Sequence, residues 1–282
     1  MSKPTVHEAI QGVSSLPTLP TVLSKVLAAA ADPDASAVDL SQHIAADQTL
    51  SAEVLKLVNS AYYGLRRQVD SITTAIVMLG FFEVRNVALA VTAFRNFPGA
   101  NADYDRTQLW RHSLGAAMAA DRLAKTLGLP VQRAFIAGLL HDIGKVVFDA
   151  LYPRQFREAA HQAHQHGRFI RDAEPETLGL THADAGALLA DHWNLPPAIV
   201  DAIRHHHAPE FSDHDPELTA LAALADFTTY QADLGETSNG RESEAPDVSA
   251  TLTVADEHLC AVAEELKKSH DGNNQFLGAL GC

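Results

Sequence analysis

Cysteine is almost missing from this chain of 282 residues, in which only Cys260 and Cys282 occur. Two cysteines cannot form a disulfide framework, so a reducing compartment, the cytoplasm, is expected. Long hydrophobic runs are missing too, because charged residues interrupt each apolar stretch well short of the roughly 18 residues of a membrane span. No apolar run follows a basic start at the N-terminus, so we expect neither a signal peptide nor a membrane partner.

Basic residues are scarce relative to acidic ones. The chain has 21 Lys and Arg against 35 Asp and Glu, a net charge of −14 with neutral histidines. Nucleic-acid polymers and anionic membranes attract concentrated Lys and Arg, so neither is expected as the main partner. Apolar residues make up 46% of the chain, as a soluble globular protein requires. The length allows one large domain or two small ones.

Apolar residues recur at helical spacing through most of the chain, and no alternating run of strand length occurs. Ser71 and Asp215 are predicted N-caps, and Gly128 is placed where a helix ends. We therefore predict an all-α fold. The expected helices cover residues 20–31, 38–45, 50–58, 72–79, 81–97, 109–127, 130–148, 153–166, 183–193, 218–230 and 252–266.

The first clear break in composition is the PGAN stretch at 98–101, where we place a boundary between subdomains. Residues 1–98 are expected to form an N-terminal helical subdomain, and residues 102–232 a second helical core. The third region, 233–282, begins with a stretch rich in Glu, Ser, Gly and Asn, which predicts a flexible linker at 235–250. An amphipathic helix at 252–266 and a polar tail follow it.

Histidine is the residue in excess, with 15 copies. Chance alone gives roughly one His-Asp pair in such a composition, so the dipeptide by itself is a weak motif. Three pairs occur, and their contexts differ. The pairs at 214–215 and 270–271 lie in polar stretches, and Asp215 has a capping role that needs no metal. The pair His141-Asp142 lies inside an apolar helical stretch, residues 135–148, which must be buried on most faces.

Burying a carboxylate, an imidazole and the ammonium group of Lys145 in one apolar helix is costly unless they are paired or bind a cation. One interpretation is a buried ion pair, because Lys145 lies three residues after Asp142. That pair leaves the imidazole of His141 unexplained. The other interpretation is a metal site, and the flanking Gly138 and Gly144 would let backbone or a ligand approach closely.

Other residues place an imidazole or a carboxylate beside apolar segments: His112, His182, His205, His206, His207 and Asp226. A core histidine bonded to a backbone carbonyl is the alternative for His112, and a helix cap is the alternative for His182. Ligands of these types that converge from several helices suit one or two divalent transition-metal ions, Fe, Mn, Ni or Zn. The polar segment with His161, His164 and His166 is interpreted as solvated surface.

The order of these motifs resembles the HD superfamily of metal-dependent phosphohydrolases, whose pattern is His, then His-Asp, then a distant Asp. It is most similar to the HDOD branch, the HD-related output domain of bacterial signalling proteins, over nearly all of residues 12–230. The N-terminal half matches in LPTLP at 16–20, NSAYYG at 59–64 and IVMLG at 76–80. The C-terminal half matches in WRHS at 110–113, GLLHDIGK at 138–145, LGLTHADAG at 178–186, WNLP at 193–196 and AIRHHH at 202–207.

The resemblance implies an HD-type helical core at 102–232 with an additional N-terminal HDOD subdomain. Asp142 would bridge the metal ions if two bind, and Lys145 matches the lysine that faces the phosphate in catalytic relatives. These two are therefore the candidate catalytic residues, and no residue is assigned to an organic cofactor. The implied metal ligands are His112, His141, Asp142, His182, His206, His207 and Asp226.

The sequence departs from the catalytic relatives at two places. Relatives that hydrolyse cyclic di-GMP follow the double histidine with Glu and a Gly-Tyr-Pro motif, whereas residues 207–211 here read HAPEF. Gln108 stands where some of those relatives carry a glutamate ligand. The resemblance therefore implies a regulatory output module with a metal site, whose partner is a signalling protein or a small phosphorylated ligand. The alternatives are a metal-dependent phosphohydrolase or phosphodiesterase acting on a small phosphate ester or a nucleotide, and, for assembly, a homodimer.

Overall fold

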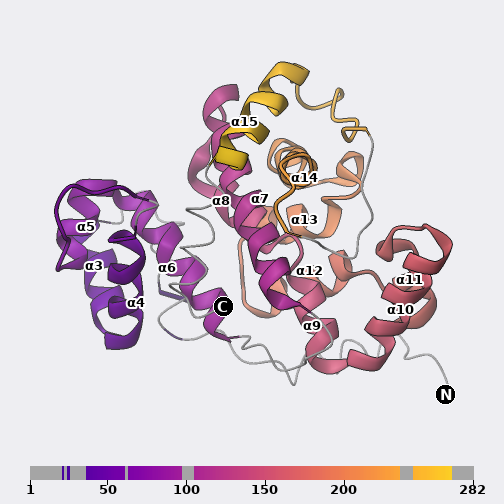
Figure 1. Ribbon diagram of the computed structural model, residues 1–282, viewed down its shortest axis with the longest axis horizontal. Coiled ribbons are helices and arrows are strands. Elements are labelled where there is room, and N and C mark those ends of the chain that lie inside the picture. Colours follow the sequence, from indigo (N-terminus) through magenta and orange to yellow (C-terminus); the bar gives the residue numbers. More distant parts are fainter. Residues whose placement is uncertain are drawn as a thin grey trace. The chain divides into compact units, whose positions relative to one another are not determined.

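The structure is a computed structural model, shown in Figure 1, and it describes residues 21, 24, 25, 36–60, 63–96, 105–235 and 244–268. Within these ranges all regular elements are helices and no strand occurs, which confirms the predicted all-α fold. No helix in this part of the chain is both long and apolar enough to cross a membrane. The helix predicted at 20–31 and the His-Asp pair at 270–271 lie mostly or wholly outside the described residues.

Contacts between Cα atoms divide the chain into two compact units. Of the described residues, 36–96 belong to one unit, and 105–235 with 244–267 belong to the other. Part of the predicted linker at 235–250, residues 236–243, lies outside the described ranges, whereas Val248 within the same predicted linker is buried. The last described helix, α15 (Asp256–Lys268), is tied to the second unit by an ion pair between Glu265 and Arg122 (3.0 Å).

The unit of residues 36–96 packs short helices by their apolar faces: α3 (Ala37–Ala45), α4 (Gln48–Val58), α5 (Ile72–Leu79) and α6 (Phe81–Asn96). Side-chain oxygens fix the starts of the first three. Ser36 and Asp39 form a capping box, Asp47 accepts from two backbone amides, and the predicted cap Ser71 accepts from one. Each cap satisfies a backbone donor that the first turn of a helix leaves unpaired.

Asn59, directly after α4, holds the segment that leads to α5. Its side-chain nitrogen donates to the backbone carbonyls of Val69 (2.7 Å) and Leu55 (2.8 Å). Its side-chain oxygen accepts from the backbone amide of Val69 (2.7 Å). Val69 is buried, so this clamp fixes the place at which the chain re-enters the core of the unit.

We expect Asn59→Ala to loosen the unit of residues 36–96 by about 2 kcal/mol, because it removes hydrogen bonds to backbone groups that are shielded from water. Hydrogen exchange read by mass spectrometry should become faster in residues 36–96 and stay unchanged in residues 105–235. The control is Gln48→Ala, at an exposed position of α4. Equal exchange rates in the two variants would contradict the clamp.

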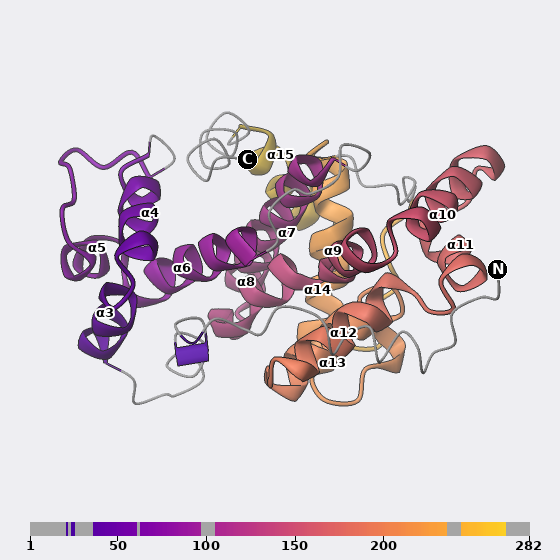
Figure 2. The same ribbon diagram turned by 90° about the horizontal axis from the view of Figure 1, so that it is seen from below.

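The second unit holds the helices that surround the candidate ligands: α7 (Arg106–Leu127), α8 (Val131–Leu140), α9 (Ile143–Leu151), α10 (Pro153–His166), α11 (Ile170–Thr177), α12 (His182–His192), α13 (Pro197–His205) and α14 (Pro216–Gln231). α7 packs on both α8 and α14, while α12 packs on α9 and α13 (Figure 2). Gly128 ends α7 in the left-handed conformation (φ 69°), and Asp215 caps α14, both as predicted.

Small residues let the central helices approach closely. A Cβ atom at Gly138 on α8 would crowd the backbone carbonyl of Ala116 on α7, and Ala116 is fully buried. A Cβ atom at Gly144 on α9 would overlap the carbonyl oxygen of His182 on α12. The close approach predicted at Gly138 and Gly144 is therefore an approach of backbone to backbone, and it brings His182 to the His-Asp pair.

The helix predicted over residues 130–148 is interrupted. α8 ends at Leu140 and α9 begins at Ile143, with His141 and Asp142 in the turn between them. In a continuous helix, neighbouring side chains point about 100° apart. The break instead lets both side chains face one site. The prediction of an unbroken helix was wrong because the apolar pattern continues on both sides of a turn only two residues long.

Candidate metal centre

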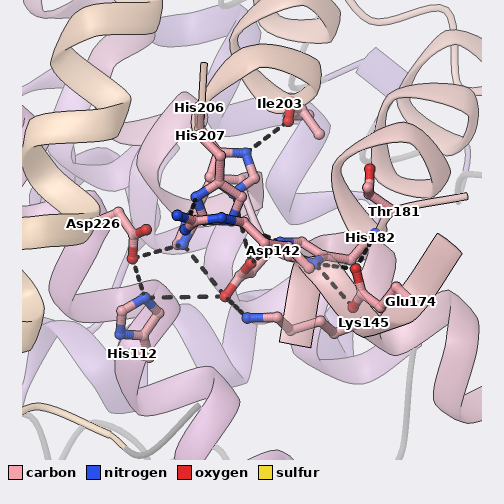
Figure 3. A network of polar contacts seen from close by, with 12 residues as sticks. His112, Asp142, Lys145, Glu174, Thr181, His182, Ile203, His206, His207 and Asp226 are labelled. Carbon is pink, nitrogen blue, oxygen red and sulfur yellow. Dashed lines mark hydrogen bonds and ion pairs between the residues drawn. The ribbon is translucent and has the colours of Figure 1, made fainter. Parts of the chain in front are cut away.

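Separate segments of the second unit bring the predicted ligands together (Figure 3). The fold supplies them from α7, the turn between α8 and α9, the start of α12, the end of α13, and α14. Six of the side chains are buried and the seventh, that of His207, is half-buried. In chain order they are His112, His141, Asp142, His182, His206, His207 and Asp226.

Asp142 lies between two groups of these side chains. Its Oδ2 atom faces His112 and His141, whose Nε2 atoms are 4.0 and 3.5 Å away. Its Oδ1 atom faces His182 and His206, whose Nε2 atoms are 3.2 and 3.8 Å away. Each carboxylate oxygen thus serves a different group, which is the arrangement that a carboxylate shared by two metal ions needs.

Each group is compact. In the first, Oδ1 of Asp226 lies 2.7 Å from Nε2 of His112 and 3.5 Å from Nε2 of His141. Tyr230, one turn further along α14, packs against His112 with 4.6 Å between the ring centroids and an angle of 40° between the ring planes. In the second group, the Nε2 atoms of His182 and His207 are 3.0 Å apart. Within each group the ligand atoms lie within 4.8 Å of one another, so each has the size to surround an ion.

Backbone carbonyls orient the rings of His141 and His206. The Nδ1 atom of His141 donates to the carbonyl of Gly138, and that of His206 donates to the carbonyl of Ile203, both over 2.7 Å. A carbonyl oxygen only accepts hydrogen bonds, so each Nδ1 atom carries a hydrogen. The Nε2 atom of each ring faces Asp142. Metal-binding histidines are usually held in this way, with the second ring nitrogen donating to a fixed acceptor.

Glu174 on α11 orients His182 and was not predicted. Its buried carboxylate accepts from Nδ1 of His182 (2.7 Å) and from the backbone amide of the same residue (2.8 Å). A carboxylate behind a ligand histidine fixes the ring and raises its basicity. The stretch around Glu174 is polar and has Pro175 inside the helix, so neither periodicity nor a motif marks this residue in the sequence.

Arg171, on the same helix, was not predicted either. Its Nη1 atom donates to Nδ1 of His207 over 3.3 Å. Its guanidinium carbon also lies 4.2 Å from the centroid of the Phe169 ring. In the sequence, nothing separates this arginine from an ordinary surface charge.

Four buried atoms of the predicted ligands have no hydrogen bond: Nδ1 of His112, and three atoms that face the interior of the centre, Nε2 of His141, Nε2 of His206 and Oδ1 of Asp142. An unpaired polar atom in a buried site costs about 1–3 kcal/mol. The three interior atoms are imidazole nitrogens and a carboxylate oxygen, which are a donor set of divalent transition metals. The residues present therefore fit a metal ion.

The carboxylates control the protonation of His141. Burial lowers its pKa, but Asp142 and then Asp226 outweigh burial and raise the pKa to about 10. Burial raises the pKa of Asp142, but Lys145 and then His141 hold it well below its ordinary value. Without metal, His141 therefore carries a proton at neutral pH, and a metal ion has to displace that proton to bind.

Two of the three histidines in the second group, His206 and His207, are held neutral. Burial lowers the pKa of the third, His182, but the charge of Glu174 outweighs burial and raises it. Burial, followed by the charges of His141 and His182, lowers the pKa of His206 to about 3. The pKa of His207 lies well below its ordinary value because of burial, then His206 and His182. Neutral imidazole is the form that binds a metal, so neither His206 nor His207 has to lose a net proton at neutral pH to become a ligand.

Lys145 is fully buried and donates to Oδ2 of Asp142 over 2.5 Å. The ion pair that the sequence offers as one interpretation is therefore present. It uses Oδ2 and leaves Oδ1 toward the second group, so ion pair and metal site are compatible. The action of Lys145 on a phosphate stays a prediction, as does the binding of metal by the seven predicted ligands.

Residues that were not assigned to the site from the sequence belong to neither group of ligands. His205, the first of the triple histidine, has its Nε2 atom 3.6 Å from Oδ1 of Asp201. Gln108 accepts from the side chain of Arg111 over 2.8 Å. The histidines interpreted as solvated surface are exposed on α10: His161, His164 and His166.

The sequence is similar to those of known proteins. The model of the HDOD domain family matches residues 16–209, more than half of the chain. An uncharacterised protein of Treponema pallidum (strain Nichols) is 32% identical over 230 residues, which are 80% of this chain and 44% of that protein. The chain thus spans less than half the length of this curated relative.

Solved structures share the fold. A candidate phosphohydrolase from Shewanella amazonensis SB2B has a TM-score of 0.78 at 28% identity, over 96% of this chain and 97% of that one. A candidate signal-transduction protein from Marinobacter aquaeolei VT8 has a TM-score of 0.83 at 22% identity, over 100% of this chain and 62% of that one. With the family match and the HD-type arrangement of helices, these findings show that the chain belongs to the HDOD domain family.

Proposed function

We propose that the protein is a bacterial signal-transduction module whose HD-type site binds one or two divalent transition-metal ions. The observation that carries the proposal is the buried centre in which Oδ1 of Asp142 and the Nε2 atoms of His141 and His206 lack hydrogen bonds. If the site served stability alone, apolar groups of similar size would serve at least as well. Fe, Mn, Ni and Zn all suit this donor set.

The way in which Asp142 is shared favours two ions over one. Its Oδ2 atom would serve the ion in the first group, which holds His112, His141 and Asp226. Its Oδ1 atom would serve the ion in the second group, with the remaining three histidines. Glu174 would keep the second group in place by orienting the ring of His182.

A regulatory role is favoured over catalysis by what lies outside the centre. Among the described residues, both candidate metal groups lie in the second unit, and residues 36–96 contain none. Residues 36–96 would bind the partner, a signalling protein in the cytoplasm, while the metal site would hold the core or sense a small phosphorylated ligand. The name of the structural neighbour from Marinobacter agrees with signalling.

The chain after His207 also favours this role. It enters a short 3-10 helix, Pro209–Phe211. Relatives that hydrolyse cyclic di-GMP carry a Gly-Tyr-Pro motif after the double histidine, and that motif is missing here. Asp201 then fixes the chain, since its Oδ2 atom accepts from the hydroxyl of Ser212 (2.6 Å) and from two backbone amides. A tightly held polar turn thus occupies this stretch.

A second candidate function is hydrolysis of a small phosphate ester or a nucleotide. It is favoured by the ammonium group of Lys145 at Asp142, and the structural neighbour from Shewanella is named as a candidate phosphohydrolase. A bound metal ion would supply a water of lowered pKa and polarise a phosphoryl oxygen. Lys145 would stabilise charge that develops on the phosphate beside Asp142.

Elemental analysis of the purified full chain tests the metal centre. We expect at least one transition-metal ion per chain, and Asp142→Ala should lose most of it because both groups lose a shared ligand. His164→Ala, which removes an exposed histidine, should keep the metal content of the wild type. A wild type without metal would overturn the proposal.

An activity screen over phosphomonoesters and phosphodiesters then separates the two functions. Hydrolysis by the metal-loaded wild type that Asp142→Ala abolishes would establish the second candidate. Equal inactivity of wild type and variant would leave the signalling module.

A further inference from the structure

Helix α11 supports the second group of ligands with two charged residues. Arg171 and Glu174 are three residues apart, so they lie on one face of the helix. Glu174 accepts from His182, and Arg171 donates to His207. The proposed metal centre accounts for Glu174, which orients a ligand, but it does not account for the role of Arg171.

The hydrogen bond of Arg171 is incompatible with metal binding by His207. A guanidinium only donates, so Nδ1 of His207 accepts and, in a neutral ring, Nε2 carries the hydrogen. That Nε2 atom is the one that faces His182 in the second group. A histidine that binds metal through Nε2 needs its hydrogen on Nδ1, where it can no longer accept from Arg171. Metal binding by His207 therefore releases Nη1 of this guanidinium from His207.

This Nη1 atom would then lie at the accessible side of the centre. His207 is the half-buried member of the second group, while the other ligands are buried. The guanidinium carbon of Arg171 lies 4.2 Å from the centroid of the Phe169 ring, and this cation–π contact helps to hold the guanidinium beside His207. A planar fork of N–H donors in a fixed position matches the oxygens of a phosphate group.

We propose that Arg171 binds the phosphate oxygens of a small anionic ligand at the His207 side of the metal centre, exchanging its hydrogen bond with His207 for bonds to the ligand. The inference rests on the proposed metal centre and its small phosphorylated ligand, and it adds the residue that recognises the phosphate group. A phosphate held here reaches Arg171 with one edge and the metal centre with the other. Arg171 is a binding residue in this account, whether or not the ligand is hydrolysed.

The test is calorimetric titration of inorganic phosphate into the full chain loaded with Mn²⁺. We expect Arg171→Ala to weaken phosphate binding at least about tenfold, because it removes a charge-assisted pair of hydrogen bonds. The phosphate affinity of Arg171→Lys should lie between those of the wild type and Arg171→Ala, since lysine keeps the charge but lacks the planar fork of donors. The control is Arg168→Ala, three residues earlier, which removes an ion pair with Glu176 (2.9 Å) away from the ligands and should leave the phosphate affinity unchanged.

Metal content and thermal melting of each variant are measured alongside. A wild type that holds metal but binds no phosphate would overturn the inference and leave the metal centre intact. So would an Arg171→Ala variant that holds metal and binds phosphate as tightly as wild type. If Arg171→Ala fails to fold, Arg171→Lys decides, and wild-type affinity in that variant counts against the inference. A wild type without metal would overturn the proposed function itself, and the inference with it.

Discussion

Gly144→Ala is expected to prevent folding of the unit that holds the metal centre, or to destabilise it by more than about 4 kcal/mol. An added Cβ atom would overlap the carbonyl oxygen of His182 and lie 2.7 Å from the backbone nitrogen of Gly186. Both are backbone atoms of α12, so no side chain can turn aside, and α9 and α12 would have to separate. His182 moves with α12, so Asp142 would also lose the imidazole that now lies 3.2 Å from its Oδ1 atom.

Urea denaturation followed by far-UV circular dichroism measures the loss, together with the yield of soluble protein. The control is Gly167→Ala, because Gly167 has a positive φ of 60° and nothing within 4 Å of an added Cβ. We expect Gly167→Ala to lose about 1–2 kcal/mol of stability from its backbone conformation alone. If Gly144→Ala were as stable as this control, the contact of backbone with backbone at α9 and α12 would not hold the unit together.

The parts of the fold that the sequence predicted are those encoded locally. Ser71 and Asp215 are followed by apolar residues at helical spacing, and both cap helices in the structure. Gly128 ends α7, because a glycine adopts the left-handed conformation without strain. A cap and its helix are adjacent in the chain, so no knowledge of tertiary contacts is needed to find them.

The helices that the sequence missed are those with mixed signals. The sequence predicts no helix between residues 193 and 218, whereas Pro197 is the first residue of α13, a position that proline suits. α11 is short, polar and has Pro175 inside it, so its apolar pattern is weak. Both helices matter for the site, since α13 positions His206 and His207 and α11 carries Glu174.

The candidate ligands were found because each placed a polar group among apolar neighbours. The same reasoning explained the pair at 214–215, where Asp215 accepts from the backbone amide of Leu218 as a helix cap. It could not find Glu174 or Arg171, because each reaches the site through a side-chain contact with a residue distant in the chain, Glu174 with His182 and Arg171 with His207. Residues that support a ligand from behind need the tertiary structure to be seen.

Asp142→Ala is expected to cost about 3–5 kcal/mol of stability even with a chelator present, because it leaves the ammonium of Lys145 buried without its partner. Both side chains are fully buried, and 2.5 Å separate Nζ from Oδ2. The matched control is Asp121→Ala, which breaks a pair of similar length (2.6 Å) with the exposed Lys125. An exposed pair contributes about 0–1 kcal/mol, so the contrast isolates the effect of burial.

The double variant Asp142→Ala with Lys145→Met separates the ion pair from the other contacts of the carboxylate. We expect it to recover at least about half of the loss, measured by urea denaturation in EDTA at pH 7, because no unpaired ammonium remains. The pKa of Asp142 is held below its ordinary value, so its contribution is present above about pH 4 and disappears as the pH falls through the lowered pKa. The difference between wild type and Asp142→Ala should therefore shrink in acid. If the double variant loses as much stability as the two single variants added together, the contributions of Lys145 and Asp142 do not depend on each other. The carboxylate would then be kept for the metal alone.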